Sequence, residues 1–256
     1  MVSNALNLFR LDGRVALVTG GDKGLGQGIA IALAQAGADV AVVSRSGHAA
    51  ATLDAIAAAG RRGVALTADL SNITLIEGIV AETVAQLGRI DILVNNAGII
   101  RRAPAIEHQW NDWRAVLDVN LDAVWALCQV VGRSMIAQGR GKIINIASLL
   151  AFQGGIRVPA YAAAKHAVAG LTKALANEWA HLGVNVNAIA PGYMVTDNTQ
   201  ALRDDPERSR QILERIPAGR WGVPDDLAGA AIFLASSASD YVHGHVLVVD
   251  GGWLAR

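Results

Sequence analysis

The chain has 256 residues, 52 % of them hydrophobic, and its 22 basic and 22 acidic side chains give no net charge at pH 7. This length suits one α/β domain, residues 1–256, with a single sizeable core. The balanced charge, without a basic run longer than two residues, excludes the charge pattern of proteins that bind nucleic acids or membrane surfaces.

The cysteine count and the N-terminus bear on the compartment. Cys128 is the only cysteine, so an internal disulfide is excluded, and no Cys/His cluster predicts a zinc site. Residues 1–14 lack the apolar core and cleavage site of a leader, and no uncharged apolar run reaches about 18 residues. We therefore expect a soluble cytoplasmic protein that binds small molecules, with no metal, nucleic acid or membrane as partner.

Residues 14–19 predict a buried strand that runs into a glycine loop and an alanine-rich helix ending near residue 36. This arrangement is typical of phosphate binding, because glycines let the backbone approach a pyrophosphate and the N–H groups at the helix start attract its charge. The glycines follow a GxxxGxG spacing, and a plain turn is the alternative. The candidate cofactor residues here are Gly20, Lys23, Gly24, Leu25 and Gly26.

A second predicted strand, residues 39–43, ends in Ser44 and Arg45. At this place dinucleotide-binding folds carry an acidic residue for the adenosine ribose, whereas an arginine accommodates the 2′-phosphate of NADP. Ser44 stands where the acid would be, and Lys23 is close enough in the expected fold to approach the same phosphate as Arg45. Two cations without a carboxylate favour NADP(H); the alternative is that both are solvated surface charges.

The third and fourth predicted strands, residues 64–67 and 91–94, are joined by a helix over residues 73–87. Alternating short apolar strands and helices imply a parallel sheet covered on both faces, with ligands at the carboxyl ends of the strands. The candidates at these ends are Asp69, Leu70, Asn96, Ala97 and Gly98, where the Asp69 carboxylate is expected to accept from an adenine amino group.

Residues 110–137 predict a long amphipathic helix with Asn120 near its middle. A buried amide needs hydrogen-bond partners, so Asn120 is either a satisfied core amide or part of the site. The residues alone favour the core amide.

A strand over residues 142–147 is followed by Ser148, a loop over residues 152–159 and a helix that carries Tyr161 and Lys165. A spacing of four places the phenol and the ammonium on one helix face, about 5–6 Å apart at Cβ. An ammonium at that distance would lower the pKa of the phenol by about two units from its usual ~10. That shift suits proton exchange with a substrate oxygen, which Ser148 is placed to hydrogen-bond. The alternative is a helix with an exposed lysine and a half-buried tyrosine.

The last elements are a sixth strand over residues 184–190, a helix over residues 224–235 and a seventh strand over residues 246–249. Between them, the charged, helix-prone segment of about residues 193–220 predicts a mobile lid over the substrate, with a surface helix as the alternative. Further cofactor candidates are Pro191, Gly192, Met194 and Thr196, the last for the nicotinamide carboxamide. We predict an α/β fold, a doubly wound, seven-stranded parallel sheet with helices on both faces.

With these motifs laid out, the chain resembles the short-chain dehydrogenase/reductase family over nearly its full length, which implies a Rossmann-type fold. The resemblance rests on the glycine loop, Asp69, Asn95–Gly98, Asn120, Ser148, Tyr161, Lys165, Pro191-Gly192 and Thr196. It implies hydride transfer between a nicotinamide and a carbonyl or alcohol carbon, without a metal.

The resemblance also implies a catalytic tetrad made of Asn120, Ser148, Tyr161 and Lys165. In this interpretation Tyr161 exchanges the proton and Ser148 holds the reacting oxygen. Lys165 binds the nicotinamide ribose and lowers the pKa of the tyrosine, and Asn120 anchors a water of the proton relay. The core-amide reading of Asn120 is thereby replaced.

Several segments expected to be loops resemble those of sugar-acid dehydrogenases in this family, namely residues 99–102, 152–159, 177–180, 191–200, 215–222 and 250–256. They imply a small anionic sugar as substrate. Its carboxylate is best bound by an arginine; Arg102 or Arg157 is the expected ligand, with Arg101 nearby and Gln153 as a further contact. Those relatives imply NAD(H), whereas the two cations of the glycine loop and second strand favour NADP(H), so both cofactors stay open.

The alternatives are another carbonyl reductase of the family, such as a gluconate 5-dehydrogenase or a 3-oxoacyl reductase, and a nucleotide-sensing regulator without catalysis. Family members are commonly homotetramers, and the apolar terminus with Trp253 and Leu254 is expected to pack on a neighbouring subunit, because it would otherwise be exposed. We therefore expect a homotetramer.

Overall fold

Seven parallel strands form one sheet in the computed structural model, which describes residues 4–256. Residues 1–3 lie outside the described residues; they belong to the N-terminal segment, residues 1–14, in which the sequence predicts no leader. The strand order is β3-β2-β1-β4-β5-β6-β7. The strands are β1 (Val15–Thr19), β2 (Asp39–Ser44), β3 (Gly63–Thr67), β4 (Ile92–Asn95), β5 (Gly141–Ile146), β6 (Val184–Pro191) and β7 (Val246–Val249). The predicted doubly wound sheet is confirmed, and each strand boundary lies within one residue of its prediction.

The direction of strand addition reverses at β1, which determines where a ligand can bind. Ala16 in β1 is in register with Val40 of β2 on one side and with Ile92 of β4 on the other. Because successive connections leave β1 in opposite directions, a crevice opens outside its carboxyl end. The glycine loop after β1 and the residues after β4 line that crevice.

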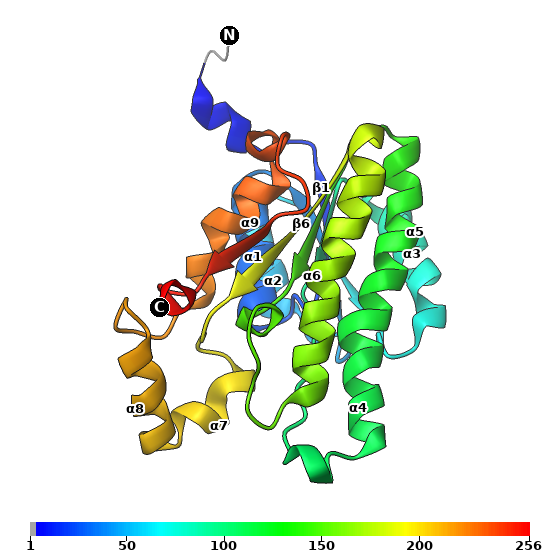
Figure 1. Ribbon diagram of the computed structural model, residues 1–256. Coiled ribbons are helices and arrows are strands. Elements are labelled where there is room, and N and C mark those ends of the chain that lie inside the picture. The colour runs from blue at the N-terminus through cyan, green and yellow to red at the C-terminus, as the bar shows by residue number, and fades with distance from the viewer. Residues whose placement is uncertain (1–3) are drawn as a thin grey trace.

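Helices cover both faces of the sheet (Figure 1). One layer contains α1 (Gly24–Gln35), α2 (Ala50–Ala58) and α9 (Ala228–Ala235). The other contains α3 (Ile76–Leu87), α4 (Trp110–Leu117), α5 (Ala123–Ala137) and α6 (Pro159–Trp179). The short helices α7 (Gln200–Arg203) and α8 (Pro206–Arg215) occupy the predicted lid segment and lie beyond the carboxyl ends of the strands. Helix α2 is absent from the sequence predictions.

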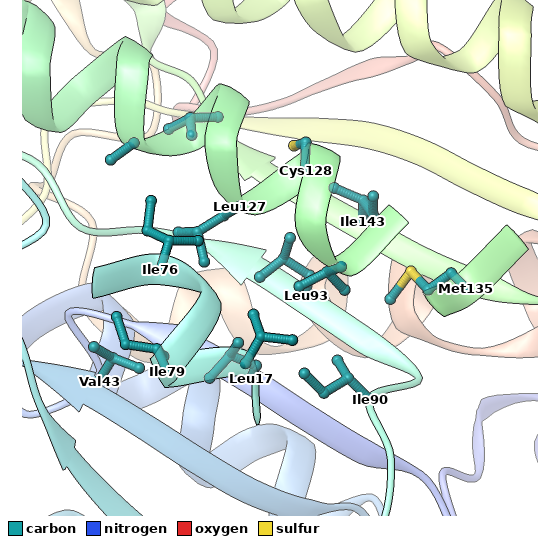
Figure 2. Packing of buried hydrophobic residues seen from close by; sticks show 14 of the residues in the cluster. Leu17, Val43, Ile76, Ile79, Ile90, Leu93, Leu127, Cys128, Met135 and Ile143 are labelled. Atoms are coloured by element: carbon teal, nitrogen blue, oxygen red, sulfur yellow. The ribbon is translucent and has the colours of Figure 1, made fainter. Parts of the chain in front are cut away.

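Buried aliphatic side chains attach the helices to the sheet. Figure 2 shows the core between the sheet and α3 and α5, where Leu17 of β1 and Leu93 of β4 lie among Ile76, Leu127 and Met135. A second cluster joins the other face to α1 and α9. Each large aliphatic side chain removed from water contributes roughly 1.5–3 kcal/mol to folding, so both layers are held by side chains rather than by helix propensity.

The predicted helix over residues 110–137 is continuous but contains one widened π turn, Asp118–Asp122, which carries Asn120. Wide turns of this type often occur at functional sites. The helix is long and apolar enough to span a membrane by those criteria alone, yet 44 % of its most apolar window is buried. Leu127, Cys128 and Met135 of this helix belong to the core in Figure 2, as expected of a core helix.

One segment expected to be a loop is helical. Asn177, Glu178 and Trp179 form the last turn of α6, and Ala180 begins a short 3₁₀ turn. Trp179 is 8 % exposed and packs over Gly132 of α5, where a Cβ atom would lie 2.8 Å from the indole ring. The apolar contact therefore extends the helix past the point where the resemblance placed a loop.

The close approach of α5 and α6 predicts the effect of a single methyl group. Gly132→Ala should lower the free energy of unfolding by about 1–3 kcal/mol, since the new methyl overlaps Trp179. Gly78→Ala in α3 is the matched control: no atom lies within 4 Å of its Cβ position, and the change should stabilise by up to about 1 kcal/mol. Urea denaturation measures both, and equal effects at the two positions would contradict the packing described.

Candidate active site

The glycine loop after β1 is shaped to let a ligand approach its backbone. Gly20 has φ +61°, and a Cβ atom on Gly26 would overlap the carbonyl oxygen of Gly20 and the side chain of Asn96. Helix α1 begins at Gly24, and the side chain of Lys23 does not cap it. Its first N–H groups therefore remain for an anion such as the pyrophosphate of a dinucleotide, which these residues fit.

Hydrogen bonds connect this loop to the end of β4. The Thr19 hydroxyl oxygen accepts from the backbone N–H groups of Asn96 and Ala97, each at 3.0 Å. The Asn96 amide donates to the carbonyl oxygens of Thr19 at 2.9 Å and Gly20 at 3.1 Å. Asn96 and Ala97, predicted as cofactor residues, therefore hold the glycine loop in place. Thr19 was predicted as the end of the first strand and belongs to the loop on which the family resemblance rests, but it was not among the predicted site residues.

Arg45 is exposed and directly follows β2, at the strand end where dinucleotide-binding folds hold the adenosine ribose. The neighbouring Ser44 is buried, and its hydroxyl accepts from the N–H of Gly47 at 3.0 Å. Hydrogen bonds from Ser71 lower the pKa of Asp69, and the charge of Arg45 contributes to that shift. Arg45 and Asp69 thus share one corner of the crevice.

Lys23 forms an ion pair across the crevice. Its Nζ lies 2.6 Å from Oδ2 of Asp197 in the lid, and both side chains are exposed. Asp197 raises the pKa of Lys23 through hydrogen bonding and charge, and the positive charge of Arg45 slightly opposes this. Lys23 and Arg45, the two predicted phosphate ligands, are thus close enough for their charges to repel each other. The ammonium of Lys23, however, is paired with Asp197.

The remaining cofactor candidates divide into core and crevice residues. Leu70 is buried with the α3 and α5 core, Leu25 packs on the opposite core and the Met194 side chain is 4 % exposed within it. Pro191 ends β6, and a Cβ on Gly192 would meet Cα of Asp250 at 2.6 Å. Thr196 lies against the glycine loop, since its Cγ2 is 3.7 Å from the position of a Cβ on Gly24.

The α6 pair is arranged around a buried lysine. Lys165 is 4 % exposed, and its Nζ donates to the carbonyl oxygen of Ile146 at 2.6 Å. The same Nζ lies 5.5 Å from the ring centroid of Tyr161. Burial lowers the pKa of Lys165 to about 8, so the ammonium form still dominates at neutral pH.

The pKa of Tyr161 is shifted in the direction opposite to the prediction. Burial raises it, while a hydrogen bond with Ser148 and the charge of Arg102 partly offset that rise. The predicted lowering by Lys165 is not seen, because the cost of burying a phenolate outweighs nearby charge and the ammonium is bound to Ile146. The phenol therefore keeps its proton at neutral pH.

Asn120 is tied to the loop after β4. Its Oδ1 accepts from the N–H of Ile99 at 2.8 Å, and its Nδ2 donates to the carbonyl oxygen of the same residue at 3.0 Å. It is fully buried and lies beside Gly98, where a Cβ would stand 3.4 Å from Oδ1. One N–H of its amide is left over for the predicted water.

A buried polar chain between β4, β5 and α6 was missed by the sequence predictions. Asn95 donates to Oδ1 of Asn145 at 2.9 Å, and Asn145 donates to the hydroxyl of Thr172 at 3.0 Å. Asn145 interrupts the apolar run of β5 and Asn95 ends that of β4, which is the signal that marks them in the sequence. Since Thr172 lies two turns after Lys165, these bonds fix α6 against the sheet.

The three candidate arginines have different surroundings. Arg101 pairs with Asp112 at 3.3 Å. The backbone of Arg157 has φ +64°, and its carbonyl oxygen accepts from Ala103 at 3.1 Å. Arg102 donates to the carbonyl oxygen of Asn198 in the lid at 2.8 Å. Burial lowers the pKa of Arg102, while the phenols of Tyr161 and Tyr193 oppose that shift, so only Arg102 is shown beside the candidate proton donor.

The C-terminal tryptophan contradicts one expectation. Trp253 is 4 % exposed within its own chain, where its ring lies 4.6 Å from that of Tyr193 and under the Arg215 guanidinium at 4.1 Å. Its indole N–H donates to Oε1 of Gln153 at 3.2 Å. Residues 193–216 and the C-terminal segment cover each other, so Trp253 needs no neighbouring subunit. Tyr193 and Arg215 were not among the predicted site residues.

The arrangement joins a buried cation, a protonated phenol and a hydroxyl at the edge of a crevice suited to a dinucleotide. Such a site can exchange a proton with an oxygen held by Ser148. Within residues 4–256, no group of three or more His, Cys, Asp or Glu side chains is placed to hold a metal ion.

Comparison with known proteins gives relatives over nearly the whole chain. The family model described as enoyl-(acyl carrier protein) reductase matches residues 20–254. The 2-dehydro-3-deoxy-D-gluconate 5-dehydrogenase of Dickeya dadantii is 58 % identical over 252 residues, which are 98 % of this chain and 99 % of that protein.

Two solved structures have the same fold. A protein of Agrobacterium tumefaciens, proposed as a 2-deoxy-D-gluconate 3-dehydrogenase and holding NADP, is 56 % identical with a TM-score of 0.92, covering 98 % of this chain and 100 % of its own. A gluconate 5-dehydrogenase of Burkholderia cenocepacia, in complex with NADP and tartrate, is 45 % identical with a TM-score of 0.95, covering 99 % and 100 %.

The buried ammonium predicts a pH dependence of stability. The folded pKa of Lys165, about 8, lies below its unfolded value of 10.5, so between these values the unfolded chain binds more protons and stability rises with pH. Relative to Lys165→Met, the free energy of unfolding of the wild type should rise by roughly 1–3 kcal/mol between pH 8 and 10. Urea denaturation at several pH values measures this difference; a constant difference would contradict a buried ammonium.

Proposed function

The chain belongs to the short-chain dehydrogenase/reductase family, and we propose that it is an NADP(H)-linked dehydrogenase of a small keto-deoxy sugar acid. The activity is that of a 2-dehydro-3-deoxy-D-gluconate 5-dehydrogenase or a 2-deoxy-D-gluconate 3-dehydrogenase. The grouping of Tyr161, Ser148 and buried Lys165 beside Arg102 is the observation that carries this proposal. The identity of 58 % to a dehydrogenase of that substrate class supports it.

The residues of the chain divide the proton chemistry between them. When bound, the nicotinamide supplies or accepts the hydride. Tyr161 gives its phenolic proton to the carbonyl oxygen in reduction and takes it from the alcohol in oxidation, while the Ser148 hydroxyl holds that oxygen. Lys165 binds the nicotinamide ribose, and Asn120 orients a water through its remaining N–H. No metal takes part in these steps.

NADP(H) is the proposed cofactor because of the charges at the end of β2. Arg45 is exposed, its neighbour Ser44 supplies no carboxylate, and Lys23 lies near enough for its pKa to respond to Arg45. An arginine binds a 2′-phosphate in two-pronged geometry. The NADP in the two solved relatives supports the same choice, and NAD(H) is the alternative.

The whole chain acts as a single domain in this proposal, and residues 193–220 form a lid over the substrate. Support comes from the position of α7 and α8 beyond the strand ends (Figure 1) and from contacts of Asp197 and Asn198 with the two sides of the crevice. Closure of such a lid would exclude water from the reacting carbon.

A homotetramer remains the proposed assembly, on grounds other than Trp253. The large apolar side chains of Trp110 and Trp125, on α4 and α5, are 71 % and 43 % exposed. Exposed aromatic side chains on adjoining helices favour a subunit interface. Light scattering should give four times the 26.7 kDa chain mass, and a monomeric mass would contradict this assembly.

The single, buried Cys128 is consistent with action in the cytoplasm.

Initial rates test substrate and cofactor together. The wild type should oxidise 2-dehydro-3-deoxy-D-gluconate faster with NADP⁺ than with NAD⁺. Oxidation of D-gluconate with NADP⁺ and reduction of a 3-oxoacyl thioester with NADPH should both be slower. Arg45→Asp should shift the cofactor preference towards NAD⁺ by at least about tenfold, since a carboxylate repels the 2′-phosphate. Equal use of both cofactors by the wild type would favour NAD(H), and faster reaction of D-gluconate would favour the gluconate 5-dehydrogenase alternative.

Arg102 is proposed as the ligand of the substrate carboxylate. Arg102→Ala should raise KM for the sugar acid by about 10- to 100-fold, which corresponds to one charge-assisted hydrogen bond. Arg157→Ala is the matched control and should change KM less than threefold. Steady-state kinetics at saturating cofactor measure both variants, and a larger effect at residue 157 would transfer the role to Arg157.

A further inference from the structure

Two donors converge on one oxygen of Gln153. Oε1 accepts from the indole N–H of Trp253 at 3.2 Å and from Nη2 of Arg215 at 3.5 Å. Both partners are donors only, and an amide nitrogen cannot accept from them. The amide orientation is therefore determined by its neighbours: Oε1 faces Trp253 and Arg215, and the Nε2 amino group faces away from them.

The two donors are themselves held in place. The Trp253 ring is buried between Tyr193 at 4.6 Å and the Arg215 guanidinium at 4.1 Å. Arg256 donates from Nε to the carbonyl oxygen of Arg215 at 3.3 Å, which ties the C-terminus to the end of α8. The side-chain amide of Gln153 therefore joins three segments: its own loop, α8 through Arg215 and the C-terminal segment through Trp253.

This junction adjoins the site described above. Tyr193, which packs on Trp253, raises the pKa of Arg102 by its charge, as does Tyr161, although burial lowers that pKa overall. Gln153 lies in the loop between Ser148 and the start of α6, and its N–H donates to the carbonyl oxygen of Leu149 at 3.2 Å. The free amino end of Gln153 is therefore close to the elements that carry the serine, the tyrosine and the proposed carboxylate ligand.

We propose that Trp253 and Arg215 are positioning residues that orient the Gln153 amide so that its Nε2 donates to an oxygen of the sugar-acid substrate. This inference rests on the proposed function for the identity of the substrate. The C-terminal segment then takes part in substrate recognition indirectly: the indole N–H of Trp253 bonds Gln153, and Gln153 bonds the substrate.

Trp253→Phe removes the indole N–H and keeps an aromatic ring for Tyr193 and Arg215. It should raise KM for 2-dehydro-3-deoxy-D-gluconate by about five- to twentyfold, as expected for one misplaced neutral hydrogen bond, with less than a twofold change in kcat and in the Kd of NADPH. Trp221→Phe is the matched control, because Trp221 packs on the same Tyr193 at 5.6 Å but does not bond Gln153. It should leave KM unchanged.

Gln153→Glu separates positioning from mere closure of the lid. The carboxylate still accepts from Trp253 and Arg215 but has no amino group and repels an anionic substrate, so KM should rise by about 100-fold or more. Unchanged KM in either Trp253→Phe or Gln153→Glu would overturn the inference. If the wild type turns over no sugar acid, the proposed function fails; the same variants are then measured with the best carbonyl substrate of a panel, where unchanged KM again overturns the inference.

Discussion

The burial of one ammonium group is the constraint on which the site depends. Removing a charge from water costs several kcal/mol unless partners replace the water. The Lys165 ammonium donates a hydrogen bond to the carbonyl oxygen of Ile146 and lies near the ring of Tyr161. Within residues 4–256, no carboxylate pairs with it. Its remaining donors therefore favour hydroxyl groups or a phenolate beside α6. The Asn145–Thr172 bond fixes the helix that imposes this burial.

The segment proposed as a lid, residues 193–220, is attached with unequal strength at its two ends. At the glycine loop, Lys23 and Asp197 are both exposed, and such pairs contribute at most about 1 kcal/mol. At the other end, Ile212 and Ile216 are buried with Trp253. Cofactor entry should therefore separate the lid from the glycine loop while α8 stays on the C-terminal segment. This asymmetry is consistent with recognition of the substrate at Gln153, beside the fixed end.

The sheet and most of the site could be predicted because their signals are local. Strands buried on both faces form short apolar runs, and glycine, asparagine and serine mark the points where they end. The chain Asn95–Asn145–Thr172 was missed because it joins residues 27 to 50 positions apart, and single polar residues show no period. The direction of the Tyr161 pKa shift was predicted wrongly because it depends on the burial of the phenol, which cannot be inferred from the spacing of tyrosine and lysine. Trp253 was wrongly predicted to pack on a neighbouring subunit. It is buried by α8 of its own chain, and the α8 segment has no apolar run that would predict this packing.

The most direct measurement is the rate of Tyr161→Phe with the cofactor bound. If the phenol transfers the proton, kcat for the sugar acid should fall by about 10²- to 10⁴-fold, while the Kd of NADPH, measured by fluorescence titration, changes less than threefold. The hydroxyl that is lost hydrogen-bonds Ser148, and phenylalanine keeps the buried ring, so the fold should be retained. A kcat within a few-fold of the wild type would contradict the assignment of Tyr161 as the acid and base of the reaction.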